Sequence, residues 1–521
     1  MRRGGVLMIV VGVSALYHDA AVALVVDGTL VAAAQEERFS RRRFDPRMPV
    51  RALNACLEDH RLTIADVDHL AWYEDPQAKL SRQLAMGLPS IPPVSRDALF
   101  RLDASRPERG VRDLLGYDGE LSFTTHHEAH AASSFYCSGF EEAAVLTADA
   151  VGEWATTTYG RAGDAGVELL EEVVFPHSLG LLYSAVTSFL GFDVNSDEYK
   201  VMGLAPYGDP RFAAALGELV AYQEGGAIVL DERLLALDQE QMHGPALGEV
   251  FGVPPRAPES AVEQVHRDAA ASIQQLLEQI VLAKAAHLHR LVPSENLCFA
   301  GGVALNCVVN AELRRRGPFR RIFVQPAAGD AGGAVGAALQ AHHRLSGRRR
   351  RLQLVDARLG PAVDDGPLRE ALDAAAIDYE DHRGREEALL SETAARLAAG
   401  EVVGWAQGRM EFGPRALGGR SILADPRDGR MRDRINALVK QRESFRPFAP
   451  AVALEAAADH FELATPLPFM LETVPVRDPL ALPAVTHVDG SARVQTVARD
   501  LDPRFHGLLC ASGSGAGCRC C

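Results

Sequence analysis

The residues best suited to chemistry in this chain form a short histidine-rich run. His126 and His130 are four positions apart, so on a helix both imidazoles lie on one face, whereas His127 and Glu128 point elsewhere. Imidazole pairs suit first-row transition metals, and Asp149 supplies a carboxylate further along the chain. The spacing therefore predicts a metal site with positions left for substrate oxygens.

The same pattern has a plainer interpretation. A His-x-x-x-His pair occurs by chance on solvated helices, and this pair lacks the glutamate that follows the first histidine in zinc peptidases. The surrounding elements favour the metal site. Asp149 ends a predicted strand at residues 144–148 and precedes a turn that contains a glycine, which is a common way to hold a metal or a phosphate. Asp330 lies in a similar strand-to-helix turn after residues 322–325, beside the glycines of a predicted nucleotide cleft.

A third predicted strand, at residues 297–300, runs into Gly301, Gly302 and Asn306. Glycines at a strand end let the backbone approach a ligand closely, and a helix start beyond them favours an anion or a nucleotide. Two glycine-rich turns of this kind in successive strand-to-helix units predict one nucleotide cleft. Lys200 is either a phosphate contact or a surface charge, and its sequence context favours the surface charge.

The N-terminal region is predicted to open with hairpins. Three strands are expected, at residues 8–14, 20–26 and 30–35, and Asp27-Gly28 is a strong two-residue turn. A meander of this kind opens the actin-like ATPase folds, whose first turn lies near the phosphates. His18 and Asp19 lie in that turn, although His18 could equally be a turn residue bonded to its own backbone. Helices are expected at residues 49–58 and 262–291, and a loop-rich stretch at residues 75–113.

A basic stretch at residues 346–352 is interpreted as a solvated linker to a second domain. The richest segment of that domain, residues 408–421, contains Arg415 and Arg420, and Lys440 and Arg446 follow. Cations interleaved with glycine and proline in an acidic protein predict an anion pocket, because guanidinium groups bind phosphate or carboxylate with two hydrogen bonds. A solvated loop would not carry so many apolar residues.

Length and charge set outer limits. A chain of 521 residues exceeds what one hydrophobic core usually holds, so two or more domains are expected. The net charge of -15 argues against a nucleic-acid partner, which requires a basic face. No stretch is long and apolar enough to span a bilayer, and the basic, apolar start has no secretory cleavage site. These features predict a cytoplasmic protein without a membrane partner.

The last residues are unusual. Cys510, Cys518, Cys520 and Cys521 crowd a glycine-rich segment at residues 510–521, and their spacing fits no zinc-ligand pattern. The segment has neither helical nor strand periodicity. We interpret it as an aberrant tail produced by a shifted reading frame in a GC-rich gene.

Six motifs in the same order resemble the NodU/CmcH family of O-carbamoyltransferases over nearly the whole chain. They are Gly-Val-Ser-Ala-Leu-Tyr-His-Asp-Ala-Ala, Gln-Glu-Glu-Arg-Phe-Ser, His-His-Glu-Ala-His-Ala, Glu-Tyr-Lys-Val-Met-Gly-Leu-Ala-Pro-Tyr-Gly, Gly-Gly-Val-Ala-Leu-Asn and Gly-Arg-Met-Glu-Phe-Gly-Pro-Arg-Ala-Leu-Gly. The resemblance implies an α/β fold. A duplicated actin-like (ASKHA-type) ATPase domain at residues 1–345, similar to that of the tRNA threonylcarbamoyl transferases, would precede an incomplete α+β YrdC-like domain at residues 353–509.

The resemblance also implies an activity. The YrdC-like domain would make carbamoyl adenylate from ATP and carbamoyl phosphate, and the actin-like domain would pass the carbamoyl group to a hydroxyl of a small-molecule acceptor. By the same resemblance, that acceptor would be an antibiotic or other natural product, or a nodulation-factor sugar. The acceptor itself and the oligomeric state are not readable from the sequence.

Roles for single residues follow from the same resemblance, motif by motif. The implied ligands of a divalent metal, expected to be Fe(II), are His126, His130, Asp149 and Asp330. Nucleotide contacts are implied for Lys200, Gly301, Gly302 and Asn306, and catalytic roles for His18 and Asp19. Carbamoyl phosphate and ATP would be bound in the C-terminal domain by Arg415, Arg420, Lys440 and Arg446.

The chain departs from the family pattern at three places. Ala150 stands where a glycine usually follows the aspartate, which would strain the turn if it needs a positive φ. Phe44-Asp45 replaces a common His-Asp pair. An Asn-Thr-Ser-Phe-Asn motif expected after His506 is missing. Two alternatives therefore stay open: a tRNA threonylcarbamoyl transferase-like enzyme, and a truncated pseudoenzyme that binds nucleotide and metal without turnover.

Overall fold

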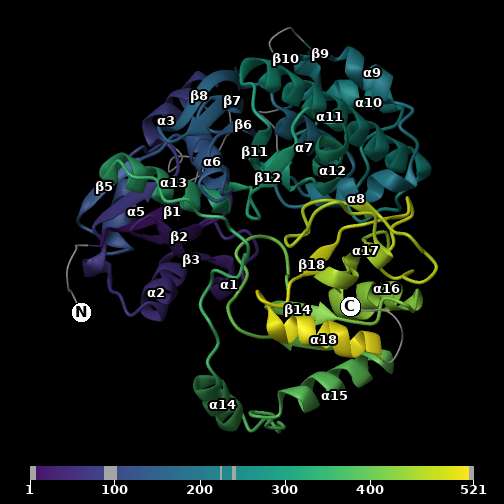
Figure 1. Cartoon of the computed structure of the whole chain (residues 1–521). Coiled ribbons are helices and arrows are strands. Elements are labelled where there is room, and N and C mark those ends of the chain that lie inside the picture. Colours follow the sequence, from purple (N-terminus) through teal and green to yellow (C-terminus); the bar gives the residue numbers. More distant parts are fainter. Residues whose placement is uncertain (1–6, 87–101, 223–225, 237–241, 515–521) are drawn as a thin grey trace. The chain divides into compact units, whose positions relative to one another are not determined.

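The structure is a computed structural model that describes residues 7–86, 102–222, 226–236 and 242–514 (Figure 1). The chain divides into two compact units, Met1–Leu354 and Val355–Cys521. The boundary lies at the C-terminal end of the basic stretch that the sequence marks as a linker. That stretch is not fully solvated, because Arg349 donates to the carbonyl oxygen of Glu141 at 2.7 Å and its guanidinium lies 4.2 Å from the ring centroid of Phe135.

The first unit contains two five-stranded sheets. The first sheet has the order β3 (Thr29–Gln35), β2 (Ala21–Val26), β1 (Ile9–Ser14), β4 (His69–Trp72) and β5 (Glu120–Phe123). The first three strands pair antiparallel, and β1, β4 and β5 pair parallel. The predicted hairpin between β2 and β3 is confirmed. Asp27 and Gly28 both have positive φ, as the favoured two-residue turn requires.

The second sheet repeats this arrangement. Its order is β8 (Gly166–Val174), β7 (Ala155–Gly163), β6 (Ala143–Ala148), β11 (Asn296–Ala300) and β12 (Arg321–Val324). Again the first three strands form an antiparallel meander, and β6, β11 and β12 run parallel. The predicted strands that end at Asp149 and at Gly301 are therefore neighbours, so their carboxyl ends meet at one edge of the sheet.

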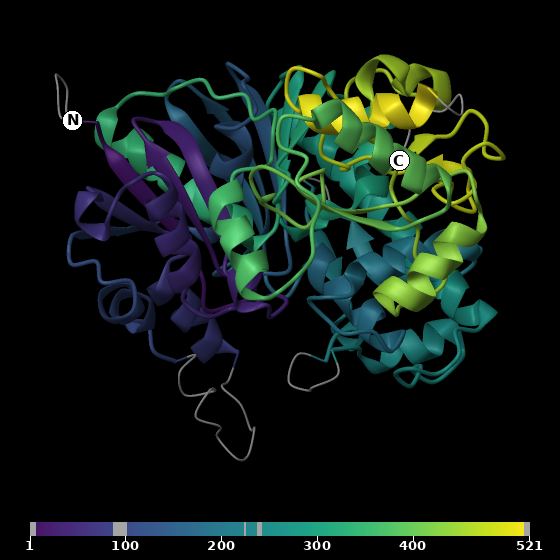
Figure 2. The same cartoon turned by 90° about the horizontal axis from the view of Figure 1, so that it is seen from below.

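Two helices fill the space between the sheets. Helix α13 (Asp330–Ser346) packs on β1 and β2, helix α6 (His126–Phe135) packs on β6 and β11, and the two helices pack on each other (Figures 1 and 2). Glycines permit this close approach. A Cβ atom on Gly12 would lie 1.9 Å from the carbonyl oxygen of Ala334, and one on Gly336 would lie 1.7 Å from that of Ala129. This packing holds both helices in the space between the two sheets.

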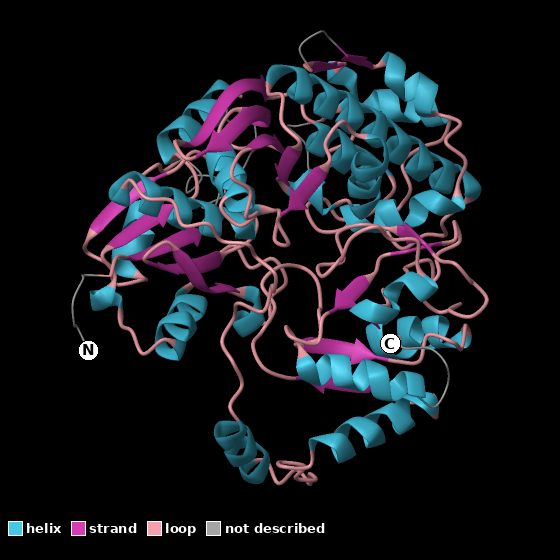
Figure 3. Ribbon diagram, in the orientation of Figure 1, coloured by secondary structure: helices cyan, strands magenta, loops and turns pink. Residues whose placement is uncertain are grey.

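The remaining elements of the first unit are mostly helices (Figure 3). They are α1 (Glu37–Ser40), α2 (Val50–Asp59), η1 (Ile64–Asp66), α3 (Pro76–Ala85), α5 (Arg106–Asp113), α7 (Leu179–Phe189), α8 (Glu198–Leu204), η2 (Ala205–Tyr207), α9 (Ala213–Glu218), β9 (Val220–Tyr222), β10 (Ile228–Leu230), η3 (Glu232–Leu234), α10 (Pro245–Phe251), α11 (Gln264–Leu291), η4 (Gly302–Leu305) and α12 (Cys307–Arg316). Among the described helices, none combines the length and the apolar character that crossing a bilayer would need.

The expectation of a loop-rich stretch at residues 75–113 is wrong at both ends, which are helical. At the start of α3, the carboxylate of Asp75 accepts from the backbone amides of Gln77 and Ala78, and Pro76 occupies the first helical position. An aspartate cap followed by proline is a helix start signal that the sequence interpretation missed. Residues 87–101 lie outside the described residues.

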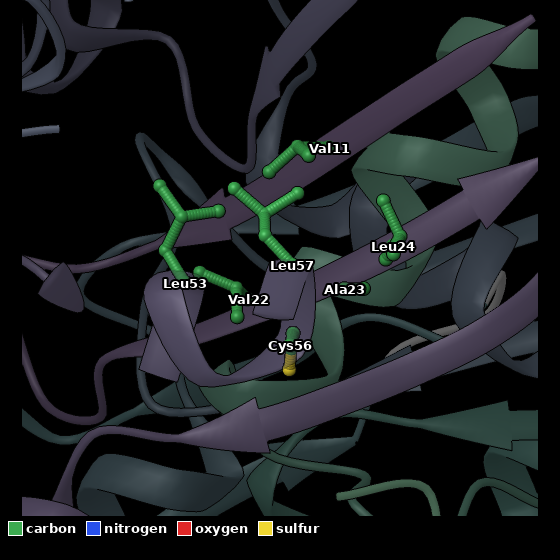
Figure 4. A pocket seen from close by; sticks show the side chains of 7 residues that line it. All are labelled: Val11, Val22, Ala23, Leu24, Leu53, Cys56 and Leu57. Carbon is green, nitrogen blue, oxygen red and sulfur yellow. The ribbon is translucent and has the colours of Figure 1, made fainter. Parts of the chain in front are cut away.

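A small apolar pocket lies between helix α2 and strands β1 and β2 (Figure 4). It is lined by Val11, Val22, Ala23, Leu24, Leu53, Cys56 and Leu57. These side chains offer neither a charge nor a strong hydrogen-bonding group. The pocket is therefore a packing feature of the core rather than a place for the predicted chemistry.

The second unit has short strands and more helices. Its elements are α14 (Asp365–Ala374), α15 (Glu386–Ala398), β13 (Val403–Ala406), β14 (Arg420–Leu423), α16 (Arg430–Arg434), η5 (Ile435–Lys440), β15 (Ala451–Ala453), η6 (Leu454–Ala456), α17 (Ala457–His460), β16 (Val474–Pro475), β17 (Ser491–Ala492), β18 (Gln495–Val497) and α18 (Pro503–Ser514). Strand pairs β13–β14 and β16–β17 are antiparallel, and β15–β18 is parallel. Its core includes Val452, Phe461, Phe505 and Leu508.

The expectation of no regular structure from Cys510 onward is wrong for the first residues of the tail. Helix α18 continues to Ser514. Phe505, Leu508 and Leu509 are buried in the core of the second unit, and Cys510 and Ala511 pack against that core. Tertiary burial thus supports a helix that local periodicity does not reveal. Residues 515–521 lie outside the described part of the chain.

The close packing of α6 and α13 gives a first prediction. In Gly336→Ala, the new methyl group would collide with the carbonyl oxygen of Ala129, so we expect a loss of about 2–4 kcal/mol in the free energy of unfolding. Gly217→Ala in α9 is the matched control, since a Cβ there meets no described atom within 4 Å. Thermal unfolding of both variants would measure the difference, and equal midpoints would contradict the packing argument.

A buried lysine gives a second prediction. Lys284 of α11 is fully buried, and its Nζ donates to Tyr159 Oη at 3.0 Å and to the carbonyl oxygen of Gly226 at 2.9 Å. Burial lowers the pKa of Lys284 to about 7. Between about pH 7 and the ordinary lysine pKa, the unfolded chain binds a proton that the folded chain does not, so stability rises with pH there.

Lys284→Met, which removes the titrating group, isolates this contribution. Relative to that variant, the wild-type chain should gain up to about 1.4 kcal/mol in the free energy of unfolding per pH unit above pH 7. Below the folded pKa the difference should level off. Denaturant unfolding of both proteins from pH 6 to pH 9 measures this, and a difference that does not change with pH would disprove it.

Candidate metal centre

The four predicted metal ligands meet in the structure. His126 and His130 lie one turn apart on α6, Asp149 follows the end of β6, and Asp330 is the first residue of α13. One ligand atom from each lies within 4.8 Å of all the others, and all four residues are buried. Two consecutive elements, α6 and β6, and the distant helix α13 thus bring the set together between the two sheets of the first unit.

The distances suit a metal ion. The Nε2 atoms of His126 and His130 lie 3.0 and 2.9 Å from Oδ2 of Asp149 and 3.0 Å from each other. Oδ1 of Asp330 is 3.8 Å from Nε2 of His126. Ligands bound at about 2.0–2.2 Å with angles between 90° and tetrahedral lie about 2.8–3.6 Å apart. Two imidazoles and two carboxylates suit Fe(II), Mn(II) or Zn(II).

The electrostatics of the cluster point in the same direction. Burial favours a neutral Asp149, but hydrogen bonds from His126 and His130 hold its pKa well below the usual range. Burial and the charge of Asp149 raise the pKa of Asp330, and its buried Oδ2 has no hydrogen-bond partner among the described residues. Two close carboxylates in a dry site call for positive charge, and a divalent cation would supply it.

Asp149 is held by the backbone on its other side. Its Oδ1 accepts from the amides of Ala150 at 2.8 Å and Gly302 at 3.2 Å, and Ser178 Oγ donates to its carbonyl oxygen at 2.9 Å. Gly301 has a φ of 95°, and a Cβ there would lie 2.2 Å from the carbonyl oxygen of Ala148. Gly301 and Gly302 therefore bring the end of β11 against Asp149, beside the cluster.

The expected strain at Ala150 is absent. Ala150 is not among the described residues with positive φ, and its amide bonds to the carboxylate of the preceding Asp149. An alanine therefore fits this turn as well as a glycine. Phe44, the second departure from the family pattern, does have a positive φ of 51°. Its ring centroid lies 4.6 Å from that of His18.

His127 supports the cluster without facing it. Its Nε2 lies 2.8 Å from the carbonyl oxygen of Ala155, which only accepts, so Nε2 carries the proton. Burial and the neighbouring imidazoles lower the pKa of His127 to about 3, so the ring is neutral and its Nδ1 accepts from Thr147 Oγ1 at 2.6 Å. These bonds tie α6 to β6 and β7, and they fix the direction in which His126 and His130 point.

Glu153 is a positioning residue that the sequence interpretation missed. Its carboxylate accepts from the backbone amide of His126 at 2.9 Å and from that of Asp75 at 2.7 Å. It therefore caps the N-terminus of α6, where the side chain of Thr125 makes no capping bond. The sequence does show a glutamate in the turn directly after the strand that ends at Asp149. It does not show that this glutamate caps α6, because a helix cap formed by a distant residue has no sequence pattern.

His18 and Asp19 lie together near the N-terminal sheet. His18 Nδ1 is 3.4 Å from Oδ2 of Asp19, and its Nε2 donates to the carbonyl oxygen of Asn195. Burial lowers the pKa of His18, but the hydrogen bond to Asp19 and the charge of Asp330 outweigh burial and raise it to about 10. In this state His18 is protonated at neutral pH, and its two N–H groups face Asp19 and the carbonyl oxygen of Asn195. A cation bound at Asp330 would act in the opposite sense and lower that pKa.

Two residues predicted to contact the nucleotide, Lys200 and Asn306, bond to other residues of the protein. Lys200 Nζ lies 2.8 Å from Oδ2 of Asp197 and 5.4 Å from the ring centroid of Phe192. Oδ1 of Asn306 caps α12 by accepting from the amides of Val308 and Val309 at 3.2 and 3.1 Å. The structure does not bring either residue into the metal cluster, and their nucleotide roles stay predictions.

In the second unit, the arginine-rich loop is held by a carboxylate that the sequence interpretation did not single out. Oε1 of Glu411 accepts from the amides of Leu417, Gly419 and Arg420 at 2.8, 2.8 and 3.0 Å. The guanidinium of Arg420 donates to the carbonyl oxygens of Gln407 at 2.9 Å and Gly419 at 2.7 Å. The loop is thus a built structure in which Glu411 positions the backbone.

Lys440 and Arg446, two of the other cations predicted to bind an anion, lie near each other in the second unit. Burial and the charges of Arg442 and Arg446 lower the pKa of Lys440. Nη1 of Arg446 lies 3.5 Å from Oε2 of Glu443. A bound anion would relieve the repulsion among these cations, and the anion pocket stays a prediction.

The first unit therefore holds a buried set of metal-type ligands between two similar sheets. Comparison with known families identifies it further. The family model described as "Carbamoyltransferase N-terminus" matches residues 9–98 and 113–339, and that described as "Carbamoyltransferase C-terminus" matches residues 394–521. The chain belongs to the carbamoyltransferase family. It is an enzyme that transfers a carbamoyl group.

Curated relatives span most of the chain. An uncharacterised Synechocystis protein, sll1178, is 42% identical over 96% of this chain and 88% of its own length. Nodulation protein NolNO of Sinorhizobium fredii is 40% identical over 94% of this chain and 71% of its own length. The 3'-hydroxymethylcephem-O-carbamoyltransferase of Amycolatopsis lactamdurans is 28% identical over 96% of this chain and 89% of its own length.

The cap provided by Glu153 gives a third prediction. Glu153→Ala would leave the amides of His126 and Asp75 unsatisfied in a buried site, so we expect a loss of about 1–3 kcal/mol in the free energy of unfolding. Metal affinity should fall by about 10–100-fold. Glu153→Gln retains an acceptor oxygen and should lose less of both. Metal competition titrations and thermal unfolding check this, and unchanged metal affinity in Glu153→Ala would contradict the positioning role.

Proposed function

We propose that the chain makes carbamoyl adenylate from ATP and carbamoyl phosphate and transfers the carbamoyl group to a hydroxyl of a small molecule. The observation that carries this proposal is the convergence of His126, His130, Asp149 and Asp330 in a carbamoyltransferase. Such a set can hold a divalent metal against the phosphate of an adenylate. We propose Fe(II) as that metal and a cytoplasmic location for the enzyme.

We further propose that the first unit is a duplicated actin-like domain. Its support is the identical order and direction of strands in the two five-stranded sheets, with α13 and α6 packed between them. In this proposal, nucleotide binds near Gly301 and Gly302, which approach Asp149 at the end of β11. A bound metal would act as a Lewis acid that stabilises charge on the leaving phosphate.

The residues of this chain would then divide the transfer among them. The acceptor oxygen attacks the carbamoyl carbon, the bond from that carbon to the adenylate oxygen breaks, and AMP leaves. His18, held by Asp19 at Nδ1, is proposed to leave the carbonyl oxygen of Asn195, orient the acceptor hydroxyl and receive its proton at Nε2. A cation held by Asp330 would lower the histidine pKa toward that role. Asp149 and Asp330, with His126 and His130, would hold the divalent cation that offsets the charge on the phosphate side of the adenylate.

The second unit is proposed to be YrdC-like and to form the adenylate. In that step water cleaves carbamoyl phosphate to carbamate and inorganic phosphate, and a carbamate oxygen then attacks the α-phosphate of ATP so that pyrophosphate leaves. Both halves need clustered cations to offset phosphate charge. Arg415, Arg420, Lys440 and Arg446 are proposed to supply that charge. The loop that carries two of them is held in shape by Glu411.

The acceptor is proposed to be a hydroxyl of a secondary metabolite or of a nodulation-factor sugar. This rests on the names of the relatives, one a nodulation protein and one a cephem O-carbamoyltransferase. A nucleic-acid substrate is disfavoured by the net charge of -15, because a polyanion would be repelled. We propose no membrane partner.

The fourth prediction tests the adenylate-forming step. Purified protein incubated with ATP, carbamoyl phosphate and Fe(II) should release pyrophosphate, which phosphorus NMR detects. Arg415→Ala should reduce the rate at least about 100-fold, whereas the control Arg430→Ala, whose side chain is 92% exposed and pairs with Asp428, should match the wild type. No pyrophosphate from the folded wild-type protein would refute the proposal.

The metal centre is tested in the same assay. His130→Ala should bind one metal ion fewer and should no longer transfer the carbamoyl group to an added hydroxyl acceptor. It should still release pyrophosphate, because His130 lies in the first unit and the adenylate is proposed to form in the second. Retained transfer in that variant would show that the cluster does not serve the reaction.

A further inference from the structure

A buried arginine of the first unit lacks a carboxylate partner among the described residues. Arg82 of α3 is 7% exposed. Its Nη1 lies 3.8 Å from Sδ of Met86, its guanidinium carbon lies 5.8 Å from the ring centroid of Phe175, and its Nε is buried without a hydrogen-bond partner in the described part of the chain. A thioether and an aromatic ring do not balance a buried charge, and buried arginines are normally paired with an anion. No step of the carbamoyl transfer proposed above uses Arg82.

The carboxylates whose charges act on Arg82, Glu74 and Glu153, are already engaged elsewhere. Both oxygens of Glu74 accept from Nζ of Lys79 at 2.8 Å. Glu153 accepts from two backbone amides, one of them at the start of α6. Since Lys79 balances Glu74, and Glu153 serves the two amides, the positive charge of Arg82 is available to a ligand.

Arg82 shares a face of α3 with a residue that contacts the turn before His18. Lys79 and Arg82 are three positions apart, so their side chains lie on one side of the helix. Nζ of Lys79 is 4.7 Å from the ring centroid of Tyr17, the residue before His18. Burial lowers the pKa of Arg82, and among the groups that raise it Tyr17 has the largest effect. Arg82 therefore lies within electrostatic reach of Tyr17, beside the residue proposed to orient the acceptor.

The second sheet of the first unit brings aromatic side chains to α3. Nε1 of Trp154 donates to Oγ of Ser81 at 3.0 Å, and the backbone amide of Phe175 donates to the carbonyl oxygen of Trp154 at 2.8 Å. Trp154 follows Glu153, the cap of α6, so this group is tied to the helix that carries the metal-type histidines. Tyr17 is 42% exposed, and Trp154 and Phe175 are partly exposed, so a ligand can reach the group from solvent.

These side chains suit a carboxylate attached to an apolar body. A guanidinium binds a carboxylate with two parallel hydrogen bonds, and such bonds strengthen where water is excluded. Aromatic rings can cover the rest of the ligand. In a chain with a net charge of -15, an anionic ligand needs a local cation. The position of Tyr17 directly before His18 puts this group on the acceptor side of the proposed reaction.

We propose that Arg82 binds a carboxylate of the hydroxyl acceptor, so that the enzyme selects acceptors that carry a negative charge. This inference rests on the transfer reaction proposed above and names the class of its substrate. The bond is a noncovalent ion pair, and Arg82 is a specificity-determining residue that takes no part in proton transfer. A phosphate of ATP or of carbamoyl phosphate is the competing source of an anion, and a structural role without a ligand is the other competing explanation.

The stability of the ligand-free protein tests the structural role. Arg82→Met keeps an apolar stem and removes a buried charge that lacks an ion-pair partner among the described residues, so its thermal unfolding midpoint should equal or exceed that of the wild type. The matched control is Arg161→Met, because the side chain of Arg161 is 61% exposed and pairs with Glu168, and this variant should leave the midpoint unchanged. A midpoint in Arg82→Met about 5 °C or more below that of the wild type would overturn the proposal.

Transfer kinetics test the selection of acidic acceptors. The acceptors are ω-hydroxycarboxylic acids of about two to eight carbons, each compared with its uncharged primary amide. For the chain length that fits, wild-type kcat/KM for the acid should exceed that for the amide at least about tenfold. Arg82→Met should lose this preference and retain the amide value within about twofold, and Arg82→Lys should retain part of the preference. A preference that persists in Arg82→Met, or acids that never exceed their amides, would each contradict the proposal.

Two further measurements separate this inference from the proposed function. Pyrophosphate release without an acceptor should give the same KM for ATP and for carbamoyl phosphate in the wild type and in Arg82→Met, and a raised KM in the variant would assign Arg82 to a phosphate instead. At least one of the acids, but not its amide, should raise the thermal midpoint of the wild type saturably and leave that of Arg82→Met unchanged. This binding test needs no turnover, so absent pyrophosphate would refute the proposed function alone, whereas an absent thermal shift would refute the carboxylate site.

Discussion

The first unit depends on holding two carboxylates and two imidazoles together away from water. Asp149 and Asp330 are both buried, and two close negative charges in a dry site are costly unless positive charge and hydrogen bonds offset them. His126 and His130 supply part of that balance, and a bound divalent cation would supply the rest. The surrounding elements are best understood as the means of keeping this set in one geometry.

Three kinds of contact do so. Backbone amides of Ala150 and Gly302 fix one oxygen of Asp149 and leave the other for the histidines. The buried carboxylate of Glu153 caps the helix on which the histidines lie. Close approach at Gly336 joins that helix to α13, which begins with Asp330. A small shift in any of them would change ligand distances, so stability and metal binding are coupled here.

In the second unit, too, a glutamate carboxylate holds backbone amides in place. One carboxylate oxygen of Glu411 accepts from three loop amides, those of Leu417, Gly419 and Arg420, and so shapes the arginine-rich segment. In both units, a buried glutamate organises backbone next to residues that carry charge. Helix α18 shows how burial decides local structure, because its apolar face in the core keeps Cys510 helical and places it beside His506 and Glu455.

Local sequence was enough to predict the opening hairpins, the strands that end at Asp149 and Gly301, and the grouping of His126 and His130 with Asp149 as metal ligands. Asp330 joined that set only through the family resemblance. The locally predicted features depend on turn chemistry, alternating burial and helical spacing, which are written in neighbouring residues. The fold alone established that β11 lies beside β6 and that Glu153 caps α6. It also decided that Asn306 caps a helix, because such contacts join residues far apart in the chain, and local sequence carries no signal for them.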